Sequence, residues 1–148
     1  MMKLQKSTSL ALVSVLEAAA NPERQVAAAE IAEKYDVSPH HLAKVLRDLG
    51  RAGIMESARG VGGGYRFTGN ARRLTLMDVI EIFEDISGRA GDEERIAATA
   101  EDRALGRVLA EIDEIARATF RSITIDTMLK LVERERRAAG EAAAAATV

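Results

Sequence analysis

The segment that most constrains the fold runs over residues 27–69, where two short amphipathic helices are followed at once by a glycine-rich hairpin. Residues 27–35 (AAAEIAEKY) predict the first helix and residues 38–53 (SPHHLAKVLRDLGRAG) the second. Ser38 is a favourable N-cap, and Pro39 takes the first helical position, where proline is tolerated. Four apolar residues at helical spacing should form the buried stripe of the second helix: Leu42, Val45, Leu46 and Leu49.

This succession is a helix-turn-helix pattern, in which the second helix enters a DNA major groove. Its solvent-facing N-terminal residues would be Pro39, His40, His41 and Lys44, with Arg47 also off the apolar stripe. An ordinary helical hairpin shows the same pattern and is commoner in proteins at large, so the pattern alone leaves both interpretations open.

Residues 54–69 (IMESARGVGGGYRFTG) predict a strand, a glycine-rich turn and a second strand. Tyr65 and Phe67 alternate with Arg66, so the aromatic rings should face inward and the arginine outward. A helix-turn-helix followed by a basic hairpin is a winged helix, and Arg59 and Arg66 can then lie along phosphates or enter a minor groove. No lysine follows the glycines as a phosphate-binding loop requires, and the loop precedes a strand rather than a helix. A purely structural hairpin remains the alternative.

The flanking segments predict further helices. Residues 8–20 place Leu12, Val15, Leu16 and Ala19 on one helical face. Another helix should begin near Thr75, with Asp78 in its first turn. Its expected apolar face consists of Val79, Ile80, Phe83 and Ile86.

A long amphipathic helix should follow a linker of small and charged residues. Its apolar stripe is longer than a small winged helix needs for its own core, which favours a dimer; folding back onto the same chain is the alternative. The candidate dimerisation residues are Leu105, Val108, Leu109, Ile112, Ile115 and Phe120. A last helix should start at Thr124, and residues 140–148 should be frayed or disordered.

Charge and composition exclude several classes of function. Residues 34–73 hold 8 basic and 3 acidic residues although the whole chain has a net charge of −2, which indicates either a polyanionic partner or an uneven surface. The absence of cysteine excludes disulfides, thiol catalysis and cysteine-ligated metals. Neither a nucleophile–base signature nor a metal-ligand cluster supports an enzyme. No apolar run reaches the ~18 residues of a membrane span, and the N-terminal apolar stretch is interrupted by Glu17, so we expect a cytoplasmic protein.

Four stretches together resemble the Rrf2 family of bacterial winged-helix transcription regulators: STSLALVSVLEAAA, VSPHHLAKVLRDLGRAGIMESARGVGGGYRF, LTLMDVIEIFE and ITIDTML. The resemblance extends from about Lys3 to Glu133. It implies a homodimer that binds a palindromic promoter site in double-stranded DNA. It adds Ser38 to the major-groove residues and Gly60 to the wing, and it implies that Lys3, Gln5 and Ser7 touch phosphates.

Many members of that family hold an iron–sulfur cluster through three cysteines before the long helix. Here Ala97 and Arg103 stand where two of the ligands would sit, so a thiolate-ligated cluster is chemically impossible within this chain. We therefore expect no metal site and no resident cofactor. The signal would be a small molecule at the dimer helices or a partner protein, unless repression is constitutive.

We predict a mostly α-helical chain with a small β-hairpin wing. The predicted parts are a winged helix-turn-helix domain over 1–86, a linker over 87–103, dimerisation helices over 104–139 and a disordered tail over 140–148. The predicted function is that of a dimeric, sequence-specific DNA-binding regulator, acting as a repressor, with no enzymatic activity and no membrane partner. The alternative is a dimeric winged-helix adaptor that binds proteins and does not read DNA specifically.

Overall fold

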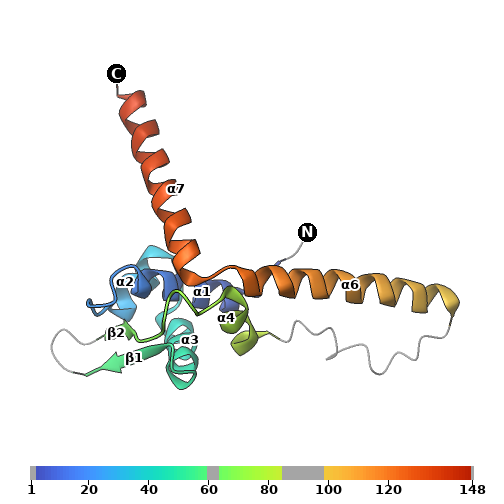
Figure 1. Ribbon diagram of the computed structural model, residues 1–148. Coiled ribbons are helices and arrows are strands. Elements are labelled where there is room, and N and C mark those ends of the chain that lie inside the picture. Colours follow the sequence, from blue (N-terminus) through green and yellow to red (C-terminus); the bar gives the residue numbers. More distant parts are fainter. Residues whose placement is uncertain (1–2, 60–63, 85–98, 148) are drawn as a thin grey trace.

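The structure is a computed structural model that describes residues 3–59, 64–84 and 99–147. The described residues form six helices and one two-stranded hairpin, which confirms the predicted fold class (Figure 1). The elements are α1 (Lys6–Ala19), α2 (Ala28–Lys34), α3 (Pro39–Arg51), β1 (Met55–Ala58), β2 (Gly64–Phe67), α4 (Leu76–Phe83), α6 (Ala100–Ser122) and α7 (Ile125–Ala146).

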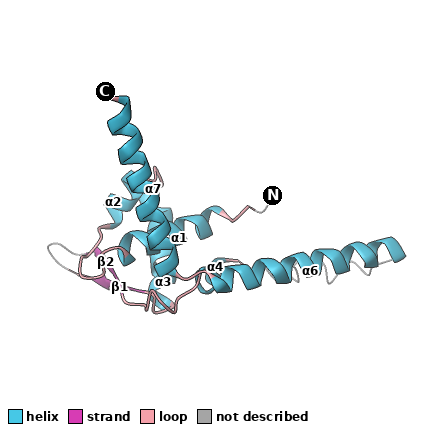
Figure 2. Ribbon diagram, turned by 45° about the horizontal axis from the view of Figure 1, so that its top comes forward, coloured by secondary structure: helices cyan, strands magenta, loops and turns pink. Residues whose placement is uncertain are grey.

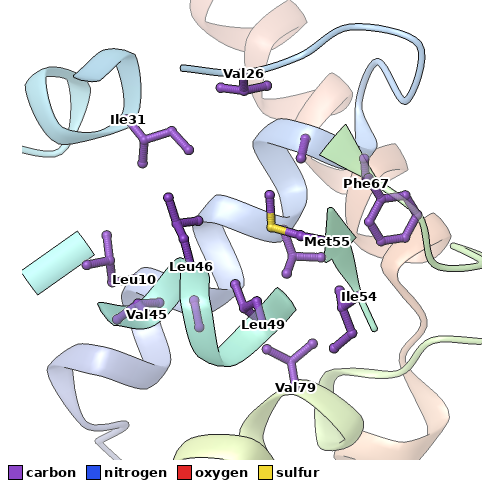
Figure 3. Packing of buried hydrophobic residues seen from close by; sticks show 14 of the residues in the cluster. Leu10, Val26, Ile31, Val45, Leu46, Leu49, Ile54, Met55, Phe67 and Val79 are labelled. Atoms are coloured by element: carbon purple, nitrogen blue, oxygen red, sulfur yellow. The ribbon is translucent and has the colours of Figure 1, made fainter. Parts of the chain in front are cut away.

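One aliphatic core holds the N-terminal elements together. Helix α1 packs against α3, α4, α7 and β2. The predicted stripe of α3 is confirmed, because all four of its residues are buried, and Figure 3 shows Leu46 and Leu49 directed into the centre of the cluster. Ile31, Met55, Phe67 and Val79 reach the same cluster from α2, the two strands and α4. The helix-turn-helix and the hairpin therefore share a single core.

The buried face of α1 differs from the prediction. Val15 and Ala19 are buried as expected, but Leu12 and Leu16 are only half-buried. Small residues such as Ala11 and Ala18 occupy the core side of the helix instead, since they let neighbouring elements approach its axis closely.

The predicted caps of α3 and α4 are both present. The Ser38 hydroxyl accepts a hydrogen bond from the backbone N–H of His41 at 3.4 Å. Thr75 and Asp78 form a reciprocal capping box, in which the Asp78 N–H donates to Thr75 Oγ1 at 3.2 Å and the Thr75 N–H donates to Asp78 Oδ2 at 2.8 Å.

The hairpin is antiparallel, and Met55 pairs with Phe67 on its core side. Tyr65 on β2 also exchanges two backbone hydrogen bonds of 2.8 Å with Val26, which joins the hairpin to the segment before α2. A Cβ on Gly64 would lie 2.6 Å from the Val26 carbonyl oxygen, so only glycine lets the two backbones come this close. Gly64 thus serves the attachment of the wing to the body.

Helices α6 and α7 diverge from the body in different directions (Figures 1 and 2). Helix α6 begins four residues earlier than predicted, because the Thr99 side chain caps it by accepting from the Asp102 N–H at 3.1 Å. The expected start of the last helix is confirmed, with Thr124 as its N-cap. Ile86 and residues 87–98 of the predicted linker lie outside the described residues.

The C-terminal tail differs from the prediction. Residues 140–148 were expected to be disordered, but α7 continues to Ala146. Five successive alanines follow Glu141, and alanine has the highest intrinsic helix propensity, so a helix already begun at Ile125 extends through them.

Candidate nucleic-acid interface

Helix α3 presents one face to solvent while its opposite face fills the core. Pro39, His40, Lys44 and Arg47 are all exposed, and Ser38 is exposed at the cap. Apart from Pro39, which has no donor, these side chains carry donors of the kind that contact base edges and phosphates. The structure therefore brings five of the six predicted recognition-helix residues onto one accessible face.

His41 is the exception among these residues. It is half-buried, and its Nε2 atom is shielded from solvent with no hydrogen-bond partner among the described residues. This nitrogen of His41 is therefore not accessible to a ligand, whereas the ring of His40 is exposed. The structure therefore sets His41 apart from its neighbour, although both were predicted contacts.

The hairpin lies beside α3 and carries the two predicted wing arginines (Figure 1). Arg59 is exposed immediately after β1. Arg66 points outward from β2 as predicted, and its Nη2 lies 3.2 Å from Oε2 of Glu56 on the opposing strand. Gly60 lies outside the described residues.

A groove of about 520 Å³ separates α3 from the hairpin. Arg47 and Arg51 line its helix side, and Glu56 lines its strand side. The remaining lining residues are Ala43, Leu46, Gly50, Met55, Ser57 and Tyr65. The sequence analysis did not include Arg51 or Glu56 among the contact residues. A signal for Arg51 was available, because it lies one turn beyond Arg47 on the same helix.

The segment before α1 and the first turn of α1 carry the remaining predicted phosphate contacts. Lys3 and Gln5 are exposed, whereas Ser7 is half-buried in the first turn. The Glu84 carboxylate accepts hydrogen bonds from the Gln5 backbone N–H and the Thr8 hydroxyl, both at 2.5 Å. A carboxylate here is favourable because it meets the positive end of the helix dipole. No local sequence signal could reveal Glu84, which lies 79 residues from Gln5 in the chain.

The apolar stripe of α6 is open to solvent over most of its length. The exposed fractions are 59% for Leu105, 53% for Val108, 51% for Leu109, 52% for Ile112 and 67% for Ile115. Phe120 differs from these five predicted dimerisation residues, because it is half-buried and packs against the core of its own chain. An exposed row of large aliphatic side chains is unusual for a monomer and marks an interaction surface.

A polar cluster fixes α2, the first helix of the helix-turn-helix, against α1. The Glu17 carboxylate accepts hydrogen bonds from Lys34 Nζ and from the Tyr35 hydroxyl, the latter at 2.8 Å. Partial burial tends to raise the pKa of Glu17, but the hydrogen bonds from Lys34 and Tyr35 outweigh it and lower that pKa. Burial and the bond to Glu17 raise the pKa of Tyr35 to about 12.

The donor set does not fit an iron–sulfur cluster. Thiolate ligands are unavailable because the chain contains no cysteine. Within residues 3–59, 64–84 and 99–147, no group of three or more histidine, aspartate or glutamate side chains is arranged to hold a metal ion. None of the helices in this described part is long and apolar enough to cross a membrane.

Comparisons with known proteins agree with this architecture. The Rrf2 family model, described as iron-dependent transcriptional regulator, matches residues 4–131. BadM of Rhodopseudomonas palustris, a proposed HTH-type transcriptional regulator, is 56% identical over 136 residues, which are 92% of this chain and 86% of that protein.

Two solved structures show the same fold. CymR, the global cysteine regulator of B. subtilis, has a TM-score of 0.73 at 23% identity, covering 88% of this chain and 98% of CymR. IscR of T. potens has a TM-score of 0.68 at 24% identity, covering 90% of each chain.

Proposed function

The chain belongs to the Rrf2 family of transcriptional regulators, and from this premise we propose that it is a homodimeric repressor that binds a palindromic promoter site. Its family consists of regulators rather than enzymes. The observation that carries the proposal is the exposed face of α3: it bears Lys44 and Arg47, and the helix packs against the hairpin that bears Arg59 and Arg66. Such a face can place a helix in a major groove while the wing contacts the adjacent backbone or minor groove.

The homodimer is proposed from the apolar stripe of α6. Five large aliphatic side chains on that stripe are more than half exposed in the single chain, and a second copy would cover them. A two-fold arrangement also provides two recognition helices for two half-sites one helical turn, or a multiple of it, apart.

Regulation without a resident iron–sulfur cluster is the second part of the proposal. The family description includes iron dependence, but this chain lacks every thiolate ligand such a cluster requires. We expect the purified protein to contain no stoichiometric iron and to bind the same DNA after treatment with a chelator. The signal would then be a small molecule or a protein partner, unless repression is constitutive.

The test is selection of bound fragments from the genome of the source organism by the purified protein, at salt concentrations of roughly 50 and 200 mM. A repressor of the proposed kind should enrich a palindrome that survives the higher salt, with half-sites spaced by whole helical turns. For alanine substitutions of cations in α3 or the wing, Lys130→Ala is the matched control, because it removes one exposed cation from α7, away from the wing. Sequence-blind binding that disappears at higher salt would contradict the proposal and favour the adaptor alternative.

A further inference from the structure

Glu56 and Arg66 face each other across the hairpin. They form a directly opposed pair in the strand register, and their nearest charged atoms are 3.2 Å apart. The neighbouring pair, Met55 and Phe67, is buried, so the alternation of the strands turns Glu56 and Arg66 to the solvent side. The wing arginine that would contact DNA thus already has an anionic partner in the free protein.

The pair is too exposed to be an important source of stability. The side chains of Arg66 and Glu56 are 47% and 64% exposed, and ion pairs at such positions contribute little to folding. A weak, solvated pair of this kind can be exchanged readily for another anion. A DNA phosphate is such an anion, and it binds guanidinium through the same geometry as a carboxylate.

The surroundings of Glu56 are otherwise basic. Glu56 also borders the groove between α3 and the hairpin, where the other charged lining residues among those described are Arg47 and Arg51. A carboxylate here lowers the positive potential of the face that a polyanion would approach.

We propose that Glu56 is an electrostatic brake on DNA binding: it holds Arg66 in an ion pair that the phosphate backbone must displace. This inference rests on the proposed function, because it requires Arg66 to contact DNA. The effect is independent of base sequence, since the groups that compete for Arg66 are a carboxylate and a phosphate. Glu56 therefore weakens binding to arbitrary DNA and leaves a larger share of the affinity to base contacts from α3.

The experiment compares Glu56→Gln with the unmodified chain on two duplexes, one carrying the selected site and one scrambled. We expect Glu56→Gln to bind both duplexes about three- to tenfold more tightly, with a steeper dependence on salt. Glu56→Asp keeps the charge and should remain close to the unmodified protein. Glu133→Gln is the matched control, because it breaks a similar exposed pair with Arg137, at 3.3 Å, on α7 away from the wing.

A double variant separates action through Arg66 from a general effect of charge. In an Arg66→Ala background the gain from Glu56→Gln should fall to less than about twofold, because Glu56 then has no arginine to pair with. A gain that persists in that background overturns the proposal. So does a Glu56→Gln variant that binds no more tightly, or less tightly, while Arg66→Ala still weakens binding; the proposed function would then stand without the brake. If the unmodified chain binds neither duplex, both proposals fail.

Discussion

Replacing Ile112 with lysine should dissociate the proposed dimer while leaving the single chain folded. Ile112 lies in the middle of the exposed stripe of α6 and is 52% exposed in the single chain. Lysine is a good helix former, so the change removes apolar surface and adds charge without breaking the helix.

The size of the effect follows from the exposed fraction. Complete burial of an isoleucine side chain contributes ~1.5–3 kcal/mol, and about half of that surface is still available to a partner, so each copy loses ~1 kcal/mol. A symmetric interface counts the substitution twice, and two ammonium groups must also leave water or turn aside. A total of at least about 3 kcal/mol corresponds to roughly a hundredfold rise in the dimer dissociation constant.

Analytical ultracentrifugation over a range of concentrations measures this constant, and circular dichroism checks that the helices persist. The matched control is Ala110→Lys, which adds the same charge at an exposed position nearly opposite the stripe on the same helix. Unchanged association of Ile112→Lys, or equal losses in the two variants, would refute the assignment of this face to the dimer. Relative to the unmodified chain, Ile112→Lys should also lose more affinity for the full palindrome than for a single half-site.

Three further substitutions test other parts of the molecule. Arg59→Ala should weaken binding to every DNA sequence and reduce the salt slope by about one unit, as titrations at several salt concentrations would show; an unchanged slope removes Arg59 from the phosphate contacts. Lys44→Ala should cost ~1–3 kcal/mol at particular base pairs, and a uniform loss across a panel of mutated sites would make it a backbone contact instead. Tyr35→Phe should alter the pH dependence of the free energy of unfolding in urea. Because the pKa of Tyr35 is raised from 10.0 to about 12, its extra stability is complete below pH 10 and is lost as pH rises toward 12. The stability gap between the two proteins should therefore narrow over that range, whereas parallel profiles would contradict the role of the Tyr35–Glu17 bond.

The helix-turn-helix could be predicted because its signals are local. Ser38 and Pro39 mark the start of α3, and four large aliphatic residues at helical spacing leave only one face to bury. The capping box at Thr75 and Asp78 is a similar short-range signal. Where the signal was weaker the prediction was only partly right. Helix α1 buries Val15 and Ala19 as expected, but it also buries small residues that a search for large aliphatics passes over, and Leu12 is only half-buried.

The charge pairing of the candidate interface could not be predicted from the sequence. Glu56 and Arg66 are 10 residues apart, and only the strand register places them opposite each other. A shift of one residue in that register would have turned one of the two side chains toward the core. The contact of Glu84 with the start of α1 spans the whole winged helix, so it depends on how α1 and α4 pack. In both cases the charged residues can be recognised in the sequence, but the residues they pair with cannot.

The predicted winged helix over 1–86 and the predicted dimerisation helices over 104–139 are not packed separately in the folded chain, because the two segments share part of one core. Ile125, at the start of α7, is fully buried in the winged-helix core. Around it, the Ile125 N–H donates to the Leu74 carbonyl at 2.8 Å, and the Leu76 N–H donates to the Ile123 carbonyl at 2.9 Å.

The junction of α6 and α7 is therefore part of the same body as the start of α4. This anchoring explains why one helix carries two kinds of apolar residue: Phe120, near the anchored end of α6, packs on its own chain, whereas Leu105 to Ile115, on the part that projects, remain exposed. A partner bound to the projecting part would hold two recognition helices at a separation set by this short junction. The spacing of the half-sites would then report the geometry of α6 directly.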